Sequence, residues 1–480
     1  MALPRLSHKW TTLGVVATSV FTATLDASAI AVSLPNLAVE FGASFDTLQW
    51  VVLGYLLVIT GMLLPIGRAA DALGRRRIFL GGLAVFVVGS LLAGLSVGIW
   101  MLIGFRVLQA LGGAATQAIG AALVIDAFPG HERGRAMGLV LAAVSAGLVA
   151  GPIAGGLLTA TIGWRWIFFI NVPVGIMSLA LGWRTLPVSV TAGPRKFDFA
   201  GSILLLVGLV LLLFGLNRVQ VAGISSPSAS APLCIGIVLM LLFVWWQQRT
   251  PTPIVTLEMF RVREFSAATL ASFITFLGLS SLVLLLPFFL QRGIGLTAFE
   301  GGLVMATIPL LMGIAGPVAG AVADRLGTRP VASAGLGLTV AGLGFMATLP
   351  DSTGPIDIVL RLIVVGIGLG LFNSANASSL MGAAAQQHRG QASAVMALAR
   401  NTGQAVGQAL WGTLWVVIAT SILGVTTIVD QPLDAAFDAF RMTWTVAAMV
   451  AGIALIASEA RGRTKPLCGH GNSISPLPHN

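Results

Sequence analysis

Gly147-Leu-Val-Ala-Gly151-Pro152-Ile-Ala-Gly155-Gly156 lies inside an apolar run from about residue 136 to 158. A water-soluble helix rarely tolerates so many glycines with a proline. A membrane helix does, because neighbouring helices and local backbone adjustments satisfy the freed polar groups. Small residues four positions apart also let another helix approach closely. The stretch therefore predicts a membrane-spanning helix that makes either a fixed tight contact or a contact that bends and slides.

The composition of the whole chain is also that of a membrane protein. Its 480 residues are 56% hydrophobic and 9% charged, with a mean hydropathy of +0.94, whereas soluble proteins carry about 25% charged residues. A span needs about 20 apolar residues. Fourteen candidates fit, at 11–34, 48–67, 78–98, 101–124, 136–158, 166–183, 199–216, 231–246, 267–290, 301–322, 330–349, 357–380, 393–420 and 442–459. The first is too long for a cleaved signal peptide and contains Asp26.

The net charge of +10 is read as a topology signal. With the N-terminus inside, 21 of the 27 lysines and arginines fall in segments assigned to the cytoplasmic side, Arg400 among them. The opposite loops carry acids such as Glu40, Asp46 and Glu300. This distribution follows the positive-inside rule, so we expect both termini in the cytoplasm and a multi-pass protein of the cell inner (cytoplasmic) membrane. The expected partner of the basic residues is the lipid bilayer, not nucleic acid.

A duplicated loop motif divides the chain into halves. Gly67-Arg-Ala-Ala-Asp71-Ala-Leu-Gly74-Arg75-Arg76-Arg77 follows the second span, and Gly320-Ala-Val-Ala-Asp324-Arg325-Leu-Gly327-Thr-Arg329 follows the tenth. Such repeats are typical of transporters built from two related halves. We therefore expect a six-span bundle at 1–186, a linker with two extra spans at 187–264, a second six-span bundle at 265–460 and a cytoplasmic tail at 461–480.

Each loop copy is a candidate conformational gate. Its glycines permit a tight turn, and an aspartate such as Asp71 can accept hydrogen bonds from a helix N-terminus in the other half, where the helix dipole is positive. The alternative is a topology signal combined with ordinary turn chemistry. The residues assigned to the gate are Gly67, Asp71, Gly74, Arg75, Arg76, Asp324, Arg325 and Gly327.

Arg106 lies inside the predicted fourth span, in Ile103-Gly-Phe-Arg106-Val-Leu-Gln109-Ala110-Leu-Gly-Gly113. An arginine in a span costs about 2.5–3.5 kcal/mol on insertion scales, so it indicates function by default. Gln109, Thr116 and Gln117 follow at helical spacing and give one polar face. The alternative is that Arg106 extends to the outer interface.

Asp26 lies in the middle of the first span, on one helical face with Ser19, Thr22 and Ser33. Desolvation favours the neutral carboxyl and a nearby arginine favours the charged one. This competition allows Asp26 to titrate with a membrane pH gradient, so Asp26 and Arg106 are the proton-coupling candidates. The alternative is a paired structural aspartate.

The second half has few charges inside its spans. Its polar candidates are amides, including Asn401 and Gln408, which either line a cavity or join helices at about 0.6–2 kcal/mol each. No metal or cofactor site is expected, because the sequence offers no plausible metal cluster and no histidine in a span. The substrate-cavity candidates over both halves are Thr22, Gln109, Thr116, Gln117, Asn373, Asn376 and Gln404.

These motifs resemble those of the major facilitator superfamily. The Gly147–Gly156 stretch resembles the antiporter motif of its exporters, so Gly147, Gly151, Pro152, Gly155 and Gly156 are assigned to an antiporter helix. The paired loops resemble the cytoplasmic gate loop of the superfamily. The Arg106 run resembles its R-x-x-Q-G-x-G motif, with Ala110 where the family usually has glycine.

Two further stretches resemble the fourteen-span drug:proton antiporters within the superfamily. Asp26 and the Leu34-Pro35 pair match the signature of their first span, although residues 28–33 depart from it. Gly163-Trp164-Arg165-Trp166-Ile-Phe-Phe-Ile-Asn171-Val-Pro173 resembles their loop between the fifth and sixth spans, and also fits an aromatic interface belt. The resemblance covers nearly the whole chain.

The resemblance implies an all-α major facilitator fold with a central cavity between the halves. It also implies proton-coupled export of small amphipathic or apolar organic compounds, with Asp71 docking near Gln391 at the start of the thirteenth span. Proton-coupled uptake of a small organic solute is the nearest alternative, since gate loops do not encode direction. A membrane-embedded enzyme or lipid-handling protein fits less well, because no nucleophile–base pair is evident. Whether a periplasmic adaptor takes part is left open.

Overall fold

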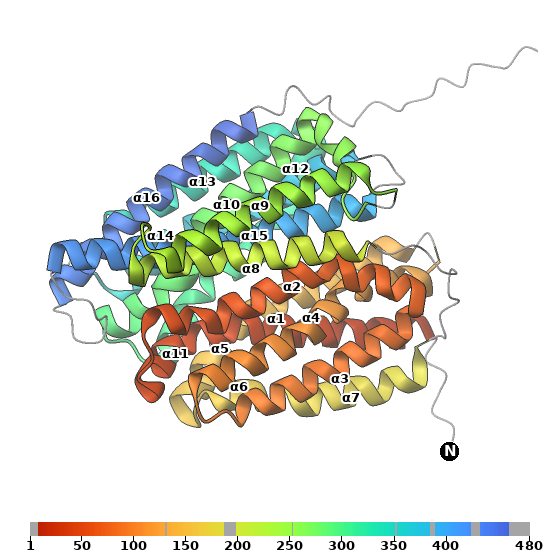
Figure 1. Ribbon diagram of the computed structural model, residues 1–480, viewed down its shortest axis with the longest axis horizontal. Helices are drawn as coiled ribbons and strands as arrows, with labels where there is room; N and C mark the ends of the chain where they lie inside the picture. Colours follow the sequence, from red (N-terminus) through yellow and green to blue (C-terminus); the bar gives the residue numbers. More distant parts are fainter. Residues whose placement is uncertain are drawn as a thin grey trace, which may run out of the picture.

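The computed structural model describes residues 8–129, 132–186, 198–251, 253–350, 353–384, 389–423 and 433–459, and these residues are almost entirely helical. The helices lie side by side in two groups, with α1–α7 in the lower part of Figure 1 and α10 and α12–α16 in its upper part. The α8 helix runs between the groups, and α11 lies lower in the view, packed on α5. The helices are α1 (His8–Phe41), α2 (Phe45–Leu73), α3 (Arg75–Gly94), α4 (Ile99–Ala127), α5 (Arg133–Thr161), α6 (Arg165–Phe169), α7 (Asn171–Thr185), α8 (Phe199–Ala222), α9 (Pro227–Arg249), η2 (Leu257–Arg261), α10 (Arg263–Phe288), η3 (Phe289–Gly293), α11 (Ala298–Met305), α12 (Thr307–Leu326), α13 (Thr328–Ala347), α14 (Pro355–Ala383), α15 (Arg389–Leu423) and α16 (Leu433–Glu459).

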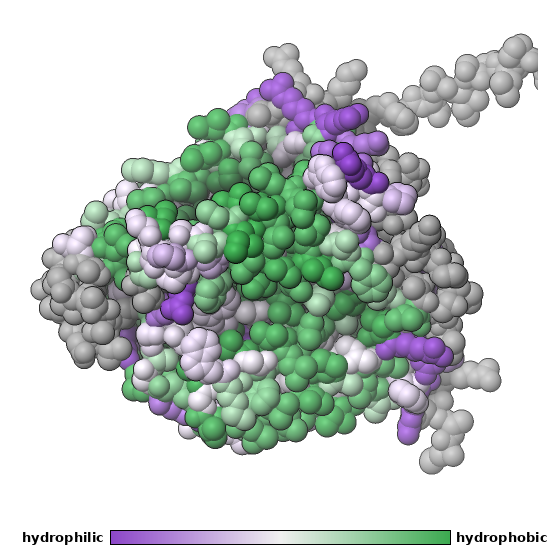
Figure 2. All heavy atoms as spheres, viewed as in Figure 1, coloured by the Kyte–Doolittle hydropathy of each residue, from purple (hydrophilic) through white to green (hydrophobic). Residues whose placement is uncertain are grey.

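The helices have the lengths and surface of membrane spans. Thirteen segments of the described chain are long and apolar enough to cross a bilayer. The place of the expected span at 393–420 is taken by α15, which is 35 residues long but outside that set. Figure 2 shows hydrophobic side chains over the middle of one face and hydrophilic ones mainly toward its ends. The predicted all-helical membrane fold is confirmed.

The two halves repeat one packing pattern. In the first half α1 packs on α5, α2 on α4, α3 on α4, α3 on α7 and α1 on α7. In the second half the pairings are α10 on α15, α12 on α14, α13 on α14, α13 on α16 and α10 on α16. Each pairing of the first list has its equivalent in the second, in the same order along the chain. The duplication seen in the loops therefore extends to the helix packing.

The turn of each loop copy depends on one glycine. Gly74 joins α2 to α3 with φ of 100°, and Gly327 joins α12 to α13 with φ of 89°. L-residues rarely adopt these angles, and glycine does so without a Cβ clash. Gly67 lies inside α2 rather than in the turn. The expectation that Gly67 shapes the turn is wrong, because the helix continues beyond it to Leu73.

Two spans are each interrupted at a single residue, although the backbone keeps right-handed helical dihedrals there. The sixth span consists of α6 and α7, which meet at Ile170, and the tenth consists of α11 and α12, which meet at Ala306. Both α7 and α12 carry proline as their third residue, at Pro173 and Pro309. Proline lacks the N–H that would bond the carbonyl four residues earlier, and each break lies three residues before a proline.

The two extra helices bridge the halves. The α9 helix packs mainly on α8, whereas α8 contacts both α2 and α15. At one end of α8, Trp50 Nε1 donates to Asn217 Oδ1 at 3.0 Å and Asn217 Nδ2 donates to the Asp46 carbonyl at 3.2 Å. At the other end, Asp198 caps α8 and accepts a hydrogen bond from Gln247 of α9 at 2.7 Å. The bonds to Trp50 and Asp46 tie α8 to the first half by side chains.

Gly74→Ala is expected to lower the stability of the folded protein by about 1–3 kcal/mol, because alanine strains the positive-φ turn. Gly67→Ala is the matched control. A Cβ at Gly67 meets no atom within 4 Å, and alanine favours a helix interior by roughly 0.5–1 kcal/mol over glycine. Thermal unfolding of both variants in detergent measures the difference. Equal melting temperatures for the two would contradict the assignment of the turn to Gly74.

Candidate functional site

A buried ion pair joins α1 to α4. The carboxylate of Asp26 contacts Nη1 of Arg106, and the two side chains are 0% and 1% exposed. Both residues lie well inside their helices, Asp26 in the middle of α1 and Arg106 two turns after the start of α4. Neither group reaches water or lipid, so the alternative in which Arg106 extends to the outer interface is wrong.

Amide side chains complete the coordination of this pair. Gln109 accepts from Arg106 Nη1 at 2.7 Å and donates through Nε2 to Asp26 Oδ1 at 3.0 Å and to Ser90 Oγ at 2.8 Å. Asn171 donates through Nδ2 to Asp26 Oδ1 at 2.7 Å. The carboxylate therefore has one cationic and two neutral donors, supplied by α4 and by the first residue of α7.

Two aromatic rings and a carbonyl enclose the guanidinium. Its central carbon lies 4.1 Å from the ring centre of Tyr55 on α2 and 5.6 Å from that of Phe168 on α6. The third polar contact of Arg106 is from Nε to the Val51 carbonyl at 3.4 Å. Among the described residues the buried Tyr55 hydroxyl and Asn171 Oδ1 have no hydrogen-bond partner.

The energetics of such a site depend on its being complete. Moving two charges out of water is costly, and their attraction offsets that only when further hydrogen bonds satisfy the remaining atoms. Here α1, α2, α3, α4, α6 and α7 each contribute a contact. Loss of either charge leaves the other buried without a counter-charge, at about 3–5 kcal/mol.

The remaining cavity candidates of the first half are mostly occupied within their own helices. Thr22 donates to the Thr18 carbonyl at 2.8 Å, and Thr116 donates to the Gly113 carbonyl at 2.9 Å. Gln117 is half-buried. Gln109 belongs to the ion-pair network, where its amide is engaged at both ends, and its assignment to a substrate cavity stays a prediction.

The second-half candidates form a looser set. Asn373 contacts the Met312 sulfur at 3.4 Å, and Asn376 is buried. Gln404 on α15 is half-buried, and Gln408 one turn later is buried with neither amide atom paired among the described residues. Arg361 on α14 is satisfied close by, by Asp357 of the same helix at 3.2 Å and Thr348 at 3.1 Å.

Three members of the buried network were not among the sequence candidates. Asn171 interrupts an apolar motif at the α6–α7 break. A lone amide in such a place indicates a buried polar contact, whereas the prediction from the sequence was an interface belt over the whole stretch. Tyr55 is the single tyrosine of the chain, which is a weak signal. Ser90 lies among small residues of α3 and offers none.

The glycines of the antiporter helix form two stripes on α5. A Cβ at Gly147, Gly151 or Gly155 would lie within 3 Å of the α1 backbone. The neighbouring stripe faces the other half of the protein. A Cβ at Gly156 would lie 2.4 Å from the Ala298 carbonyl oxygen of α11, and one at Gly302 of α11 would lie 2.1 Å from that of Pro152. The same helix therefore touches α1 inside its own half and α11 across the interface.

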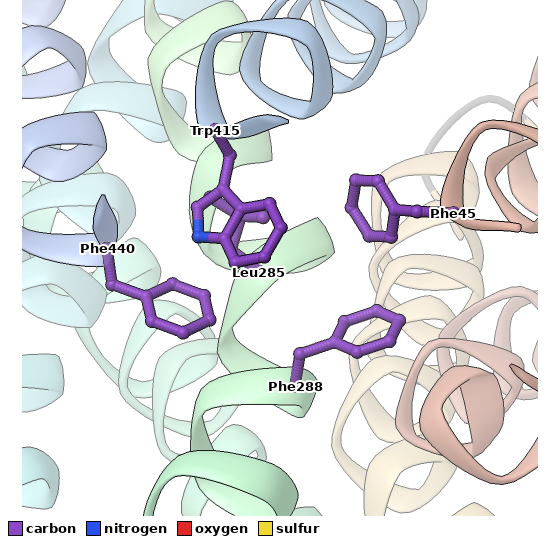
Figure 3. A pocket seen from close by; sticks show the side chains of 5 residues that line it. All are labelled: Phe45, Leu285, Phe288, Trp415 and Phe440. Atoms are coloured by element: carbon purple, nitrogen blue, oxygen red, sulfur yellow. The ribbon is translucent and has the colours of Figure 1, made fainter. Parts of the chain in front are cut away.

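Aromatic side chains join the halves at the end that carries Glu40 and Arg165, which are themselves ion-paired at 2.6 Å. Phe45 of α2 lies 5.3 Å from Phe288 and 5.8 Å from Trp415, between ring centres. In Figure 3 these rings gather with Leu285 and Phe440, and the apolar space between them is too small to hold a water molecule. Gln291 also donates to the Val32 carbonyl at 2.6 Å. This end of the interface, called the sealed end below, is closely packed.

The gate candidates lie at the opposite end. Arg75 pairs with Asp126 of α4 at 2.6 Å, and Arg76 donates to the Trp183 carbonyl of α7, so both bind within the first half. Asp324 and Arg325 are exposed at the end of α12. The Asp71 side chain lies outside the described residues, and Gln391 accepts a hydrogen bond from Thr256. Arg400, assigned above to the cytoplasmic side, lies inside α15 instead.

A double-mutant cycle on the ion pair is expected to show strong coupling. Asp26→Asn and Arg106→Gln should each destabilise the protein, by up to about 3–5 kcal/mol where a charge stays buried and unpaired. The double variant should recover part of that loss, because no lone charge remains. Thermal unfolding of the four proteins in detergent measures the coupling. Additive losses would show that the two groups do not act as a pair.

Comparison with known proteins agrees with this architecture. A riboflavin transporter of Clostridioides difficile is 30% identical over 85% of this chain and 89% of its own. A tetracenomycin C resistance and export protein of Streptomyces glaucescens is 31% identical over 84% and 76%, and the multidrug resistance protein Stp of Mycobacterium tuberculosis is 32% identical over 81% and 73%.

Solved structures support the fold alone, at low identity. A bacterial homologue of the human lysosomal transporter Spinster, inward-facing and unoccupied, matches with a TM-score of 0.69 at 16% identity over 96% of this chain and 98% of its own. A peptide transporter in complex with sulfate matches with a TM-score of 0.70 at 17% identity, over 94% and 95%. The sequence profile of the Major Facilitator Superfamily matches residues 16–408. The chain is a multi-pass secondary transporter, not an enzyme, and belongs to the Major Facilitator Superfamily.

Proposed function

We propose that the protein exports small amphipathic or apolar organic compounds in exchange for protons, as a fourteen-span drug:proton antiporter. The observation that carries this proposal is the enclosed Asp26–Arg106 pair. It places a titratable carboxyl in the middle of a span, within reach of an arginine and two amides. Intramembrane carboxylates of this kind typically mark proton pathways.

Protonation of Asp26 would change the balance of this site. A neutral carboxyl no longer offsets the charge of Arg106, so the pair loses its attraction and the buried guanidinium needs another partner. A rearrangement of the first half that gives the guanidinium a new partner then becomes energetically favourable. A proton bound at Asp26 in this way acts on the packing of α1, α4 and α7 together, which links protonation to conformation.

Alternating access requires a contact between the halves that can shift, and α5 provides one because it packs on α1 in its own half and on α11 of the other half. We propose that residues 1–186 and 265–460 move as two bodies, with α5 sliding on α11 at Gly156 and Gly302. In this proposal the sealed end faces outward and the termini lie in the cytoplasm. The clustering of basic residues at the opposite end supports this orientation in the cytoplasmic membrane.

The antiporter helix favours export over uptake, and so do two relatives that are named as an export protein and a multidrug resistance protein. Uptake by symport remains the rival. Vesicles of known orientation with an imposed pH gradient separate the two, because a proton gradient drives substrate in opposite directions under antiport and symport.

Asp26→Asn is expected to abolish pH-gradient-driven movement of amphipathic fluorescent dyes into or out of proteoliposomes, while the variant remains folded and inserted. The physical reason is the loss of the only carboxyl in the described ion-pair network. Asp357→Asn, at the start of α14 and remote from that network, is the matched control and should transport normally. Undiminished gradient-driven transport by Asp26→Asn would remove this residue from the mechanism.

Gly156→Ala is expected to shift the protein away from the sealed arrangement. The new methyl group would overlap the α11 backbone, and overpacking of this kind typically costs about 1–3 kcal/mol. Spin labels on α5 and α11 should report longer distances across the sealed end. Gly138→Ala on the same helix has open space around its Cβ and should leave the distances unchanged. Unaltered distances in Gly156→Ala would contradict a sliding contact there.

A further inference from the structure

The C-terminal half also has an arginine well inside a helix, Arg400 of α15. Arg400 follows the start of α15 at Arg389 by eleven residues, which is about 16 Å along the helix. The residue as a whole is exposed, whereas the hydrogen bond of its guanidinium group is partly buried. Its polar contact is a long one, from Nε to Asn401 Oδ1 at 3.4 Å, and its guanidinium carbon lies 6.0 Å from the ring centre of Phe276 on α10. Among the described residues it forms no ion pair with an acid.

The helix α15 presents different faces to its neighbours. Gly403 and Gly407 face α10, because a Cβ at either would lie within 2.4 Å of a carbonyl oxygen of that helix. Leu410 and Val417 are exposed and mark the apolar outer face. At about 100° per residue, Arg400 shares the α10 side and lies roughly a quarter-turn from the outer face. A charged group in hydrocarbon is unfavourable, so its guanidinium turns away from lipid.

The polar strip on this side consists of Arg400, Asn401, Gln404 and Gln408. Arg400, Gln404 and Gln408 follow one another at intervals of about one turn, so each side chain is next to the following one along the helix. Gln408 is only 1% exposed, and both its Nε2 and its Oε1 are unpartnered among the described residues. Buried polar atoms are normally hydrogen-bonded. Among the described residues the strip therefore combines a cation that has no acidic partner with an amide whose donor and acceptor are both unpaired.

The charges of the two halves differ in a way that bears on substrate choice. In the first half the charge of Asp26 is offset by Arg106, and their remaining atoms are occupied by amides. In the second half the charge of Arg400 has no described acid beside it. An arginine of this kind recognises carboxylates, sulfonates and phosphates through its planar array of donors.

We propose that the polar strip of α15 binds the anionic group of the transported compound, so that the substrates are amphipathic organic acids. The guanidinium of Arg400 holds the acidic group, and the Gln408 amide takes a second polar atom further along the helix. The ring of Phe276 provides an apolar contact beside the charge. The proposal rests on the proposed transport function and adds a substrate class to it.

Binding to the purified full-length protein tests the proposal without a proton gradient. The probes are naphthylacetate, naphthylacetamide and naphthylethylammonium, which share a ring and differ in charge at neutral pH. Intrinsic tryptophan fluorescence or thermal shift gives the affinities. The wild type should bind naphthylacetate about tenfold or more tighter than the amide, as expected for hydrogen bonds to a charged group, and should discriminate against the ammonium compound.

Arg400→Gln should bind naphthylacetate and naphthylacetamide with about equal affinity. Arg400→Lys should keep part of the preference for the acid. Arg292→Gln is the matched control, because Arg292 is also an exposed arginine but lies in η3, outside the strip. Retention of the acid preference by Arg400→Gln would overturn the proposal, as would a wild type that binds the acid no better than the amide. Failure of proton-coupled export alone would leave these affinities unchanged, so the two proposals fail separately.

Discussion

The ion pair between Asp26 and Arg106 constrains the whole first half. Its charges are away from water, so their stability depends on each contact being in place. The contacts come from α1, α3, α4 and α7, with rings from α2 and α6 around the cation. A displacement of one of these helices alone would break a hydrogen bond in a medium where water cannot replace it. The first half is therefore held together by polar chemistry at its centre and is suited to moving as a unit.

The interface between the halves, in contrast, is held mainly by apolar contacts. At the sealed end, glycines and aromatic rings make the contacts, and the hydrogen bond from Gln291 to a backbone carbonyl is a rare polar one. Contacts of this type depend on shape and carry little directional preference, so they can be exchanged for similar ones after a slide. The α5 helix contacts both regions. Gly147, Gly151 and Gly155 face α1 inside the first half, and Gly156 faces α11 across the interface.

The sequence was sufficient to predict the fold and the two charges at the centre of the candidate site. Hydropathy, the repeated loop and the rarity of charges in spans pointed to Asp26 and Arg106. It was not sufficient to identify Tyr55 and Ser90, because helical periodicity gives the face of a residue but not which neighbouring helix meets it. The breaks at Ile170 and Ala306 were missed for a related reason, since a proline inside a span is compatible with a continuous helix. Helical periodicity placed Gln109 on the correct face. It did not show that Gln109 bonds to Asp26 and Arg106, which only the packing of the helices determines.

The contacts of Arg361 bear on how the two halves differ. On α14, the repeat equivalent of α4, this arginine occupies nearly the position that Arg106 has on α4, close to the helix start. Its carboxylate partner is Asp357 on its own helix, and α10, the equivalent of α1, carries no acid in its middle. The two halves therefore carry an arginine at a similar place, whereas the acid that bridges two helices is found in the first half. The two bundles are thus alike in backbone and differ in chemistry: among the described residues the first has a central charge pair between two helices, and in the second the corresponding arginine is paired within its own helix.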